Sequence, residues 1–168
     1  MTISVTDLAT HPASERYRCF ENGRGMRVVG YGTTLEDAFE HAAEATFALL
    51  TDLAAVRAQR TLPVSFIEID DTRALARWLD LLIEAARQHE LVFAEFHLQR
   101  ERTRWWGCAT GQRRHAGLPR GMELERAVHP HAAVVRTADG WEVSCTIECG
   151  KARAPGVERR SERAAPVA

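Results

Sequence analysis

The sequence predicts an α+β fold in which two helices pack on one face of a mostly antiparallel sheet, as a two-layer sandwich. Three observations support this prediction. Two segments carry apolar residues at helical spacing, several short segments alternate apolar and polar residues, and the strand-like segments after residue 90 follow one another without a helix between them. Laying both helices on one face of the sheet buries all of these apolar faces.

Length and composition indicate one globular domain. The chain of 168 residues is long enough for one core, and its 45% hydrophobic and 27% charged residues are typical of folded proteins. We expect an N-terminal extension at residues 1–14, the folded domain at 15–149 and a disordered tail at 150–168, because the tail has almost nothing to bury.

Charge and cysteine content exclude several classes of protein. The formal net charge of −1 gives no general attraction to nucleic acid or acidic membranes. The N-terminus lacks the basic and apolar regions of a signal peptide, and no apolar run approaches the roughly 20 residues that span a bilayer. The four cysteines form no C-x-x-C pair, which favours reduced thiols over a zinc site. We therefore expect a cytoplasmic protein without membrane contact.

The most regular segment is a helix that follows a capping box. In Thr33–Glu36 (TTLE), the hydroxyl of Thr33 can accept one exposed backbone N–H, and Glu36 can reach back to another. Apolar residues recur at helical spacing from Leu35 onward, and the helix is expected to end near Asp52.

The other elements follow from the same patterns. A second helix is expected after Asp70 or Asp71, either of which can serve as its N-cap, with Trp78 and Leu82 on the apolar side. The expected strands are Tyr17–Glu21, Met26–Tyr31, Pro63–Asp70, Val92–Gln99, Thr103–Thr110, Glu123–His129, Ala132–Thr137 and Trp141–Cys149.

Several carboxylates are candidates for a functional site. Glu148 lies at the end of the last strand, Glu123 and Glu125 alternate with apolar residues on one strand face, and Asp37 lies in the first turn of the first helix. Carboxylates from such separate segments hold hard cations such as Ca²⁺ or Mg²⁺ when the fold brings them together. The alternative for Asp37 is a purely structural role, complementing the helix dipole.

Arginines and tryptophans in the second half are candidates for contact with RNA. If their segment stays extended, three of the arginines share a strand face, but a solvated edge or a protein-binding patch explains the set equally well. The residues concerned are Arg100, Arg102, Arg104, Arg113, Arg114 and Arg120, with Trp105 and Trp106. The sequence contains no catalytic signature and no paired nucleophile and base, so we do not expect an independent enzyme.

The segment from Tyr31 to Asp52, YGTTLEDAFEHAAEATFALLTD, resembles the archease family, in which a strand ending in an aromatic–glycine pair enters a "TLEEAFE…A…ALF…MTD" helix. The resemblance continues in the same order along residues 15–149. It includes Trp78-Leu79-Asp80 with Leu82 ("DWLNELL"), LVFAEF at 91–96 ("LLFSRFEV"), GMELERAV at 121–128 ("GTEVKAVT") and the closing Gly140-Trp141…Ile147-Glu148 ("GW…VILD").

The resemblance implies a small cytosolic cofactor of an RtcB-type tRNA-splicing RNA ligase, which promotes guanylylation and turnover of the ligase and is not itself an enzyme. It implies an RNA ligase as the protein partner, with only indirect contact with RNA. It also implies a divalent cation, Ca²⁺ or Mg²⁺, bound by acidic residues of the family motifs. The acids of this chain at those positions are Asp37, Glu123 and Glu148.

Departures from the family motifs fall on the same site. Asn22 stands at the expected histidine, Gly25 at the expected aspartate, and Glu125 at an expected lysine, while Glu148 replaces an aspartate with a longer acid. Losing the carboxylate at Gly25 removes a ligand and should weaken cation binding. The sequence thus leaves two functions open: a ligase cofactor with a degraded metal site, or a metal-independent interaction or chaperone-like module on the same scaffold.

Overall fold

The structure is a computed structural model that describes residues 15–23 and 25–150. Its strands form two sheets. The four-stranded sheet has the order β1-β2-β7-β6, made of Tyr17–Asn22, Gly25–Gly32, Gly140–Gly150 and Glu123–Thr137. The three-stranded sheet has the order β3-β5-β4, made of Arg60–Ile67, Arg104–Arg113 and Leu91–Glu101. All strand pairs are antiparallel.

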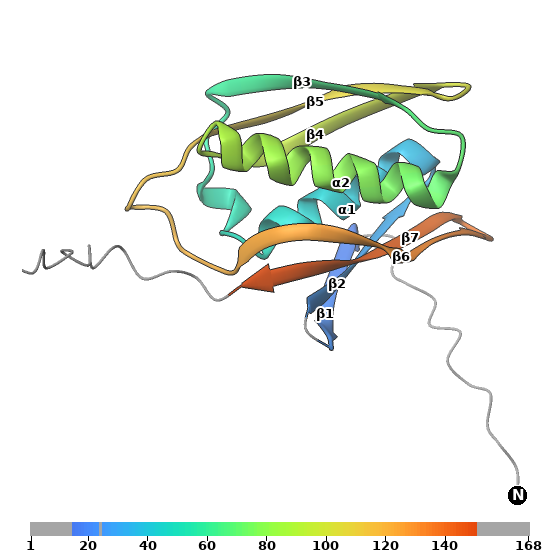
Figure 1. Cartoon of the computed structure of the whole chain (residues 1–168), viewed down its shortest axis with the longest axis horizontal. Helices are drawn as coiled ribbons and strands as arrows, with labels where there is room; N and C mark the ends of the chain where they lie inside the picture. Colours follow the sequence, from blue (N-terminus) through green and yellow to red (C-terminus); the bar gives the residue numbers. More distant parts are fainter. Residues whose placement is uncertain (1–14, 24, 151–168) are drawn as a thin grey trace, which may run out of the picture.

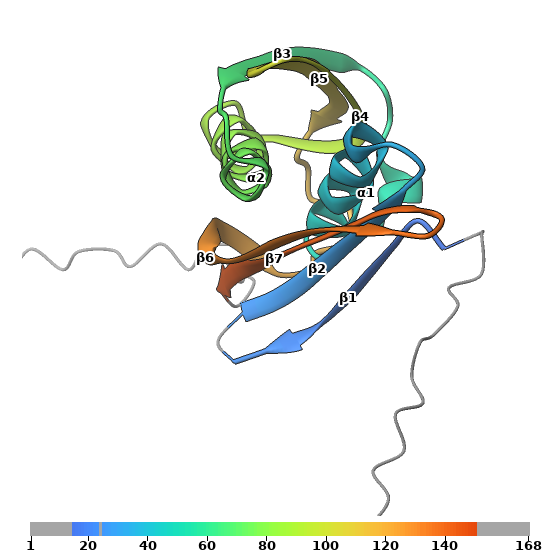
Figure 2. The same ribbon diagram turned by 90° about the vertical axis from the view of Figure 1, so that its right-hand side faces the viewer.

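The two helices, α1 (Leu35–Ala48) and α2 (Asp71–Gln88), lie between the two sheets (Figures 1 and 2). The α+β class, the two helices and the antiparallel strands agree with the prediction. The strands divide into two sheets, however, where a single sheet was expected. The reason is visible in α1, whose Ala38, Phe39 and Phe47 are all fully buried. A helix with so little exposed surface needs cover on more than one side, and the second sheet provides it.

Helix α1 lies in close contact with strand β2. A Cβ atom at Gly30 would lie 2.2 Å from the carbonyl oxygen of Ala38, and one at Gly32 would lie 2.4 Å from the Ala38 nitrogen. Only glycine allows the two backbones to approach this closely. The helix ends at Ala48, earlier than the expected end near Asp52, and Asp52 instead caps the short 3₁₀ helix Leu53–Ala55.

Helix α2 begins directly after Asp70, one of the two N-cap residues that the sequence predicted. Asp70 is the N-cap, and its Oδ1 accepts a hydrogen bond from the backbone N–H of Arg73 at 2.9 Å. Trp78 is fully buried and donates from Nε1 to the carbonyl oxygen of Phe39 at 3.1 Å, which ties α2 to α1. The aromatic side chain of Trp105 completes this part of the core by stacking on Phe39, with ring centroids 4.9 Å apart.

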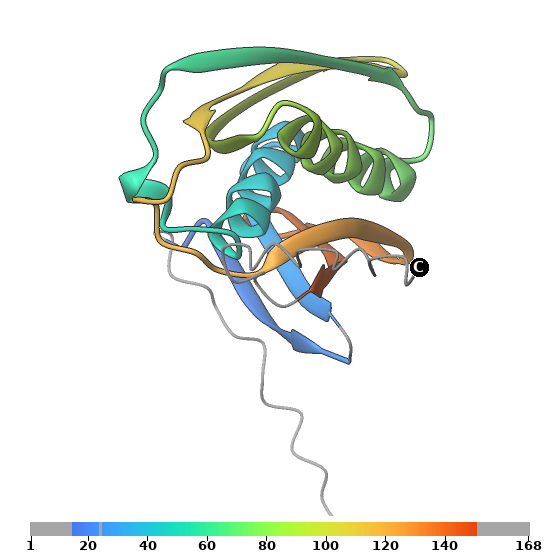
Figure 3. The ribbon, with the colours of Figure 1, turned by 60° about the vertical axis from the view of Figure 1, so that its left-hand side comes forward.

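Residues 114–122 connect β5 of the three-stranded sheet to β6 of the four-stranded sheet (Figure 3). The segment is held against the end of α1, because Gly121 and Met122 donate backbone hydrogen bonds to the carbonyl oxygens of Leu50 and Leu49, both at 2.7 Å. The next strand, β6, combines two strands that the sequence suggested separately. Its pairing with β7 shifts register between Val128 and Ala133.

Strands β4 and β6 each lie at an edge of their sheets, and each is held by a half-buried carboxylate from a helix. Glu40 of α1 accepts a hydrogen bond from the N–H of Leu98 at 2.8 Å. Asp80 of α2 accepts one from the N–H of Ala127 at 2.6 Å. Burial raises the pKa of both carboxyls, and the backbone N–H groups oppose part of that increase. These acids thus accept hydrogen bonds from two backbone N–H groups of edge strands that would otherwise have no acceptor.

The predicted extension at residues 1–14 and the predicted tail lie outside the described residues, except that Gly150 is the last residue of β7. None of the four cysteines forms a disulfide. Burial raises the pKa of the Cys145 thiol to about 12. Neither of the helices in the described part of the chain is long and apolar enough to cross a membrane.

The raised pKa values of Glu40 and Asp80 predict a pH dependence of stability. A carboxyl whose folded pKa exceeds its unfolded value stabilises the protein fully below the unfolded value, and this contribution is lost as pH rises through the folded value. Between these two pKa values, the unfolding free energy should fall with rising pH. We expect it to fall less steeply in the double variant Glu40→Gln and Asp80→Asn, because the amides still accept the N–H but do not ionise. Urea unfolding from acidic to neutral pH tests this, with the exposed acid Glu101→Gln as control. An unchanged slope would contradict it.

Candidate functional site

Asp37, the first predicted metal ligand, is engaged at the beginning of α1. Its backbone N–H donates to Oγ1 of Thr34, the N-cap, at 3.1 Å. Its carboxylate accepts a hydrogen bond from Oγ1 of Thr33 at 3.0 Å. The capping residue is therefore Thr34, and not Thr33 as the sequence suggested, because Thr34 has the extended backbone of an N-cap directly before Leu35. Asp37 thus completes a capping interaction at the positive end of the helix dipole.

Glu148, the second predicted ligand, forms an ion pair with Arg126 across strands β7 and β6. Nε of Arg126 donates to Oε2 at 2.6 Å, and Nη2 donates to Oε1 at 3.1 Å. This two-point geometry engages both carboxylate oxygens. The hydrogen bonds from Arg126 lower the pKa of the Glu148 carboxyl. Sequence reasoning missed Arg126, which is opposite Glu148 in the β6–β7 pairing.

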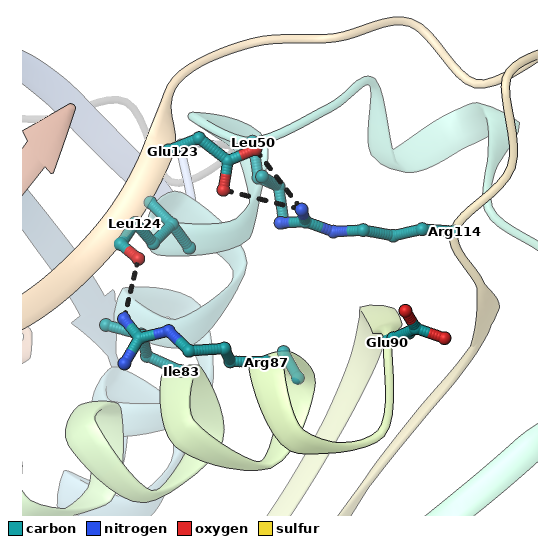
Figure 4. Close-up of a pocket in the computed structure, with 8 residues that line it drawn as sticks. Leu50, Ile83, Arg87, Glu90, Arg114, Glu123 and Leu124 are labelled. Atoms are coloured by element: carbon teal, nitrogen blue, oxygen red, sulfur yellow. Dashed lines mark hydrogen bonds and ion pairs between the residues drawn. The ribbon is translucent and has the colours of Figure 1, made fainter. Parts of the chain in front are cut away.

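Glu123, the third predicted ligand, lines a pocket of about 340 Å³ between the ends of the helices and β6 (Figure 4). Its carboxylate pairs with Nη1 of Arg114 at 3.2 Å, while Arg87 donates to the carbonyl oxygen of Leu124, also at 3.2 Å. The pocket is lined by Leu50, Ile83, Ala86, Arg87, Glu90, Arg114, Glu123 and Leu124. Its charged rim is balanced between arginine and glutamate, so it selects neither an anion nor a cation.

The fold does not bring the three acids together. Asp37 lies beside Gly32, at the end of β2 that pairs with Trp141, whereas Glu148 pairs with Gly25 at the other end of the same strand. Seven residue steps along β2 separate the two ends by about 23 Å, at about 3.3 Å per residue. Residues 15–23 and 25–150 contain no group of three or more His, Cys, Asp or Glu side chains that could hold a metal ion.

The donor set therefore does not fit the divalent cation that the family motifs imply. Asp37 is too distant to share an ion with Glu148, and Glu123 and Glu148 are each engaged by a different arginine. At Gly25, where the family motif has an aspartate, a Cβ atom would lie 2.4 Å from the carbonyl oxygen of Ile147. The backbone at this position is thus arranged for glycine.

The arginine–tryptophan segment is divided between the core and the surface. Trp105 is fully buried, and its ring stacks with Phe39 and with Phe66. Arg100 lies over the same ring and forms an ion pair with Asp71 at 2.9 Å. Trp105 is therefore not available to stack on a nucleic-acid base. Contact with RNA stays a prediction that the geometry of this segment does not strengthen.

Hydroxyl and thiol groups of the described residues form hydrogen bonds within the fold. Their partners are backbone carbonyls, other hydroxyls, carboxylates, an asparagine and an arginine. Fold and site together define a small α+β protein, with two helices between two antiparallel sheets.

Comparison with known proteins gives the family. The model of the Archease protein family (MTH1598/TM1083) matches residues 17–148. The chain therefore belongs to the archease family. Protein archease of Methanosarcina acetivorans is 24% identical over 140 residues, covering 80% of this chain and 96% of the relative. Protein archease of Aeropyrum pernix is 28% identical over 116 residues, covering 69% and 77%. The family model and these relatives indicate no enzyme family.

Two solved structures share the fold. The solution structure of Methanobacterium thermoautotrophicum protein 1598 has a TM-score of 0.66 and 21% identity, covering 79% of this chain and 98% of that one. The crystal structure of a Thermotoga maritima protein described as "an archease, possible chaperone" has a TM-score of 0.55 and 10% identity, covering 77% and 94%. At these identities the similarity establishes the fold alone.

The capping geometry predicts that Thr34 stabilises the beginning of α1 more than Thr33 does. We expect Thr34→Ala to lower the unfolding free energy by about 1 kcal/mol, because the N–H of Asp37 loses its acceptor. Thr33→Ala, the matched control, should cost less than about 0.5 kcal/mol, as is usual for exposed substitutions. Chemical denaturation of both variants measures the difference. A larger loss of unfolding free energy for Thr33→Ala would favour Thr33 as the capping residue, as the sequence suggested.

Proposed function

We propose that this archease family member is an accessory protein of an RtcB-type RNA ligase in the cytosol, where it promotes guanylylation and turnover of the ligase. The observation that carries the proposal is the family match over residues 17–148, which spans both sheets and both helices. The motif resemblance supplies the ligase as the partner class. The protein acts by contacting the ligase, and its contact with RNA is indirect.

Exposed apolar side chains support a protein-binding role. Ile67, at the end of edge strand β3, is 73% exposed, and Ile69, two residues later, is 79% exposed. Neighbouring exposed apolar residues of this size are typical of protein-interaction surfaces. Neither of the two helices covers the outer face of the three-stranded sheet to which β3 belongs (Figure 2). We assign contact with the ligase to this region, which we name the β3-end surface (Ile67 and Ile69).

A metal-independent chaperone-like module on the same scaffold is the second candidate. The observation that favours it is the ion pair between Arg126 and Glu148, which engages an acid that the first hypothesis would use for a metal. The two functions differ in specificity. A chaperone-like protein suppresses aggregation of unrelated unfolded proteins, whereas a ligase cofactor acts only on its cognate ligase.

The proposal predicts faster RNA joining by the cognate ligase under multiple-turnover conditions. With RNA in excess, adding the protein should increase the product formed per ligase and the amount of guanylylated ligase intermediate. Gel-based joining assays and labelling with radioactive GTP measure these two quantities. Bovine serum albumin at equal concentration controls for non-specific stabilisation. If neither quantity rises with the cognate ligase, the proposed function is wrong.

The β3-end surface predicts a variant that folds normally but stimulates poorly. Ile67→Ser with Ile69→Ser should leave the unfolding midpoint unchanged, because both side chains are exposed. The concentration for half-maximal stimulation should rise about tenfold, the effect of losing about 1.4 kcal/mol of binding free energy. Val135→Ser, which changes an exposed apolar side chain on β6, is the matched control. Equal stimulation by the double variant and the control would exclude this surface.

A further inference from the structure

Four residues lie side by side across the four-stranded sheet, one from each strand. Asn22 of β1 pairs with Gly25 of β2, Gly25 pairs with Glu148 of β7, and Glu148 pairs with Arg126 of β6. We name these residues the cross-sheet row. It contains the positions at which the family motifs have a histidine, an aspartate and the closing aspartate, so it is where a cation would be expected.

The carboxylate of Glu148 already has a cationic partner in this row. Both of its oxygens accept hydrogen bonds from Arg126, at 2.6 and 3.1 Å. A guanidinium in this two-point geometry satisfies the charge and the acceptor directions of the carboxylate together. The positive charge of the guanidinium would repel a metal ion at the same carboxylate.

The space above Gly25 is crossed by a neighbouring side chain. Nδ2 of Asn22 donates to Oγ1 of Thr146 on β7, at 3.1 Å. Since β2 lies between β1 and β7, the amide of Asn22 must reach over β2 to make this bond. A Cβ atom added at Gly25 would lie 3.2 Å from Cγ2 of the same Thr146. A hydrogen-bonded amide thus spans the part of the row where the family motif has a carboxylate.

Charge balance in the row is complete without an added ion. The row has one carboxylate, Glu148, and one guanidinium, Arg126, so its formal charge is neutral. A hard divalent cation is held by several oxygen ligands, and the carboxylates among them supply the negative charge. Replacing an aspartate by Gly25 removes one negative charge, and Arg126 neutralises the one that remains.

From these contacts we infer that the guanidinium of Arg126 takes the place of a divalent cation in the cross-sheet row, so that this protein folds and holds its sheet end together without metal. The inference concerns the isolated protein and does not depend on the proposed ligase partner. Its failure and the failure of the proposed function can therefore be distinguished.

The first test uses the unmodified protein. Its thermal unfolding midpoint should be the same, within error, in EDTA and in millimolar Ca²⁺, Mg²⁺ or Mn²⁺, and calorimetric titration with each ion should give no saturable heat. A midpoint that rises by several degrees with one of these ions, together with a saturable heat that Glu148→Gln abolishes, would overturn the inference.

The second test is a double-mutant cycle at Arg126 and Glu148 in metal-free buffer. Arg126→Gln and Glu148→Gln should each lower the midpoint by about 1–3 °C, the range for an exposed ion pair in a domain of this size. The double variant should lose less than the sum of the two single variants, because each removes the same pair. If the losses in midpoint are additive, or if neither single variant lowers the midpoint, the Arg126–Glu148 pair does not stabilise the cross-sheet row.

Glu125→Gln is the matched control for the change of charge. Glu125 lies on the same strand as Arg126 and carries the same charge as Glu148, but its side chain is outside this ion pair. We expect the thermal unfolding midpoint of the Glu125→Gln variant to stay near that of the unmodified protein. A loss equal to that of Glu148→Gln would mean that overall charge, and not the pair, sets the midpoint.

Discussion

The close approach of helix α1 to strand β2 is the constraint on which the rest of the structure depends. No side chain fits at Gly30 without meeting the backbone of Ala38, so the helix lies directly on the strand. This contact buries one side of α1 against the four-stranded sheet. Phe39 and Phe47 on its other sides are fully buried as well, against Trp105 and Phe93 of the three-stranded sheet. The two-sheet architecture follows from a helix that has almost no face left for solvent.

The same architecture accounts for the roles of the carboxylates. Glu40 and Asp80 each accept a hydrogen bond from a backbone N–H of an edge strand. Without these acids, the two N–H groups would be unpaired at partly buried positions. Asp37 belongs to the cap of α1, and Glu123 and Glu148 are held by arginines. Each of these acids therefore has a structural partner. An acid paired with an arginine is a poor metal ligand, because the guanidinium already offsets the negative charge that would attract the ion.

Local features of the fold could be predicted from the sequence. The helical spacing after Leu35, and Asp70 as one of two candidate caps, depend only on neighbouring residues, and both appear in the structure. The division of the strands into two sheets could not be predicted, because it depends on how widely α1 is buried. The position of the cap was wrong by one residue, since Thr33 and Thr34 offer the same hydroxyl and differ only in backbone conformation.

The candidate site was harder to predict, because it depends on pairing between distant strands. Counting back from the Thr137–Gly140 pair without any irregularity would place His129 opposite Glu148. The register shifts in β6 place Arg126 there instead. A bulge has no reliable signature in a single sequence, yet it decides which side chain faces an acid across the sheet. The distance between Asp37 and Glu148 depends on the pairing of β2 with β7, which their separate motifs do not give.

The β3-end surface and the cross-sheet row lie on different layers of the molecule. The β3-end surface belongs to the three-stranded sheet and the cross-sheet row to the four-stranded sheet, with the helices between them (Figure 1). The two sheets are joined through the helix layer and through the connecting segment 114–122, so the cross-sheet row does not contact Ile67 and Ile69 directly. Since a scaffold and the sites on it vary separately, an archease fold can lose its cation ligands and keep a partner-binding face. Binding of a protein partner at the β3-end surface is physically compatible with a neutral, metal-free row on the opposite sheet.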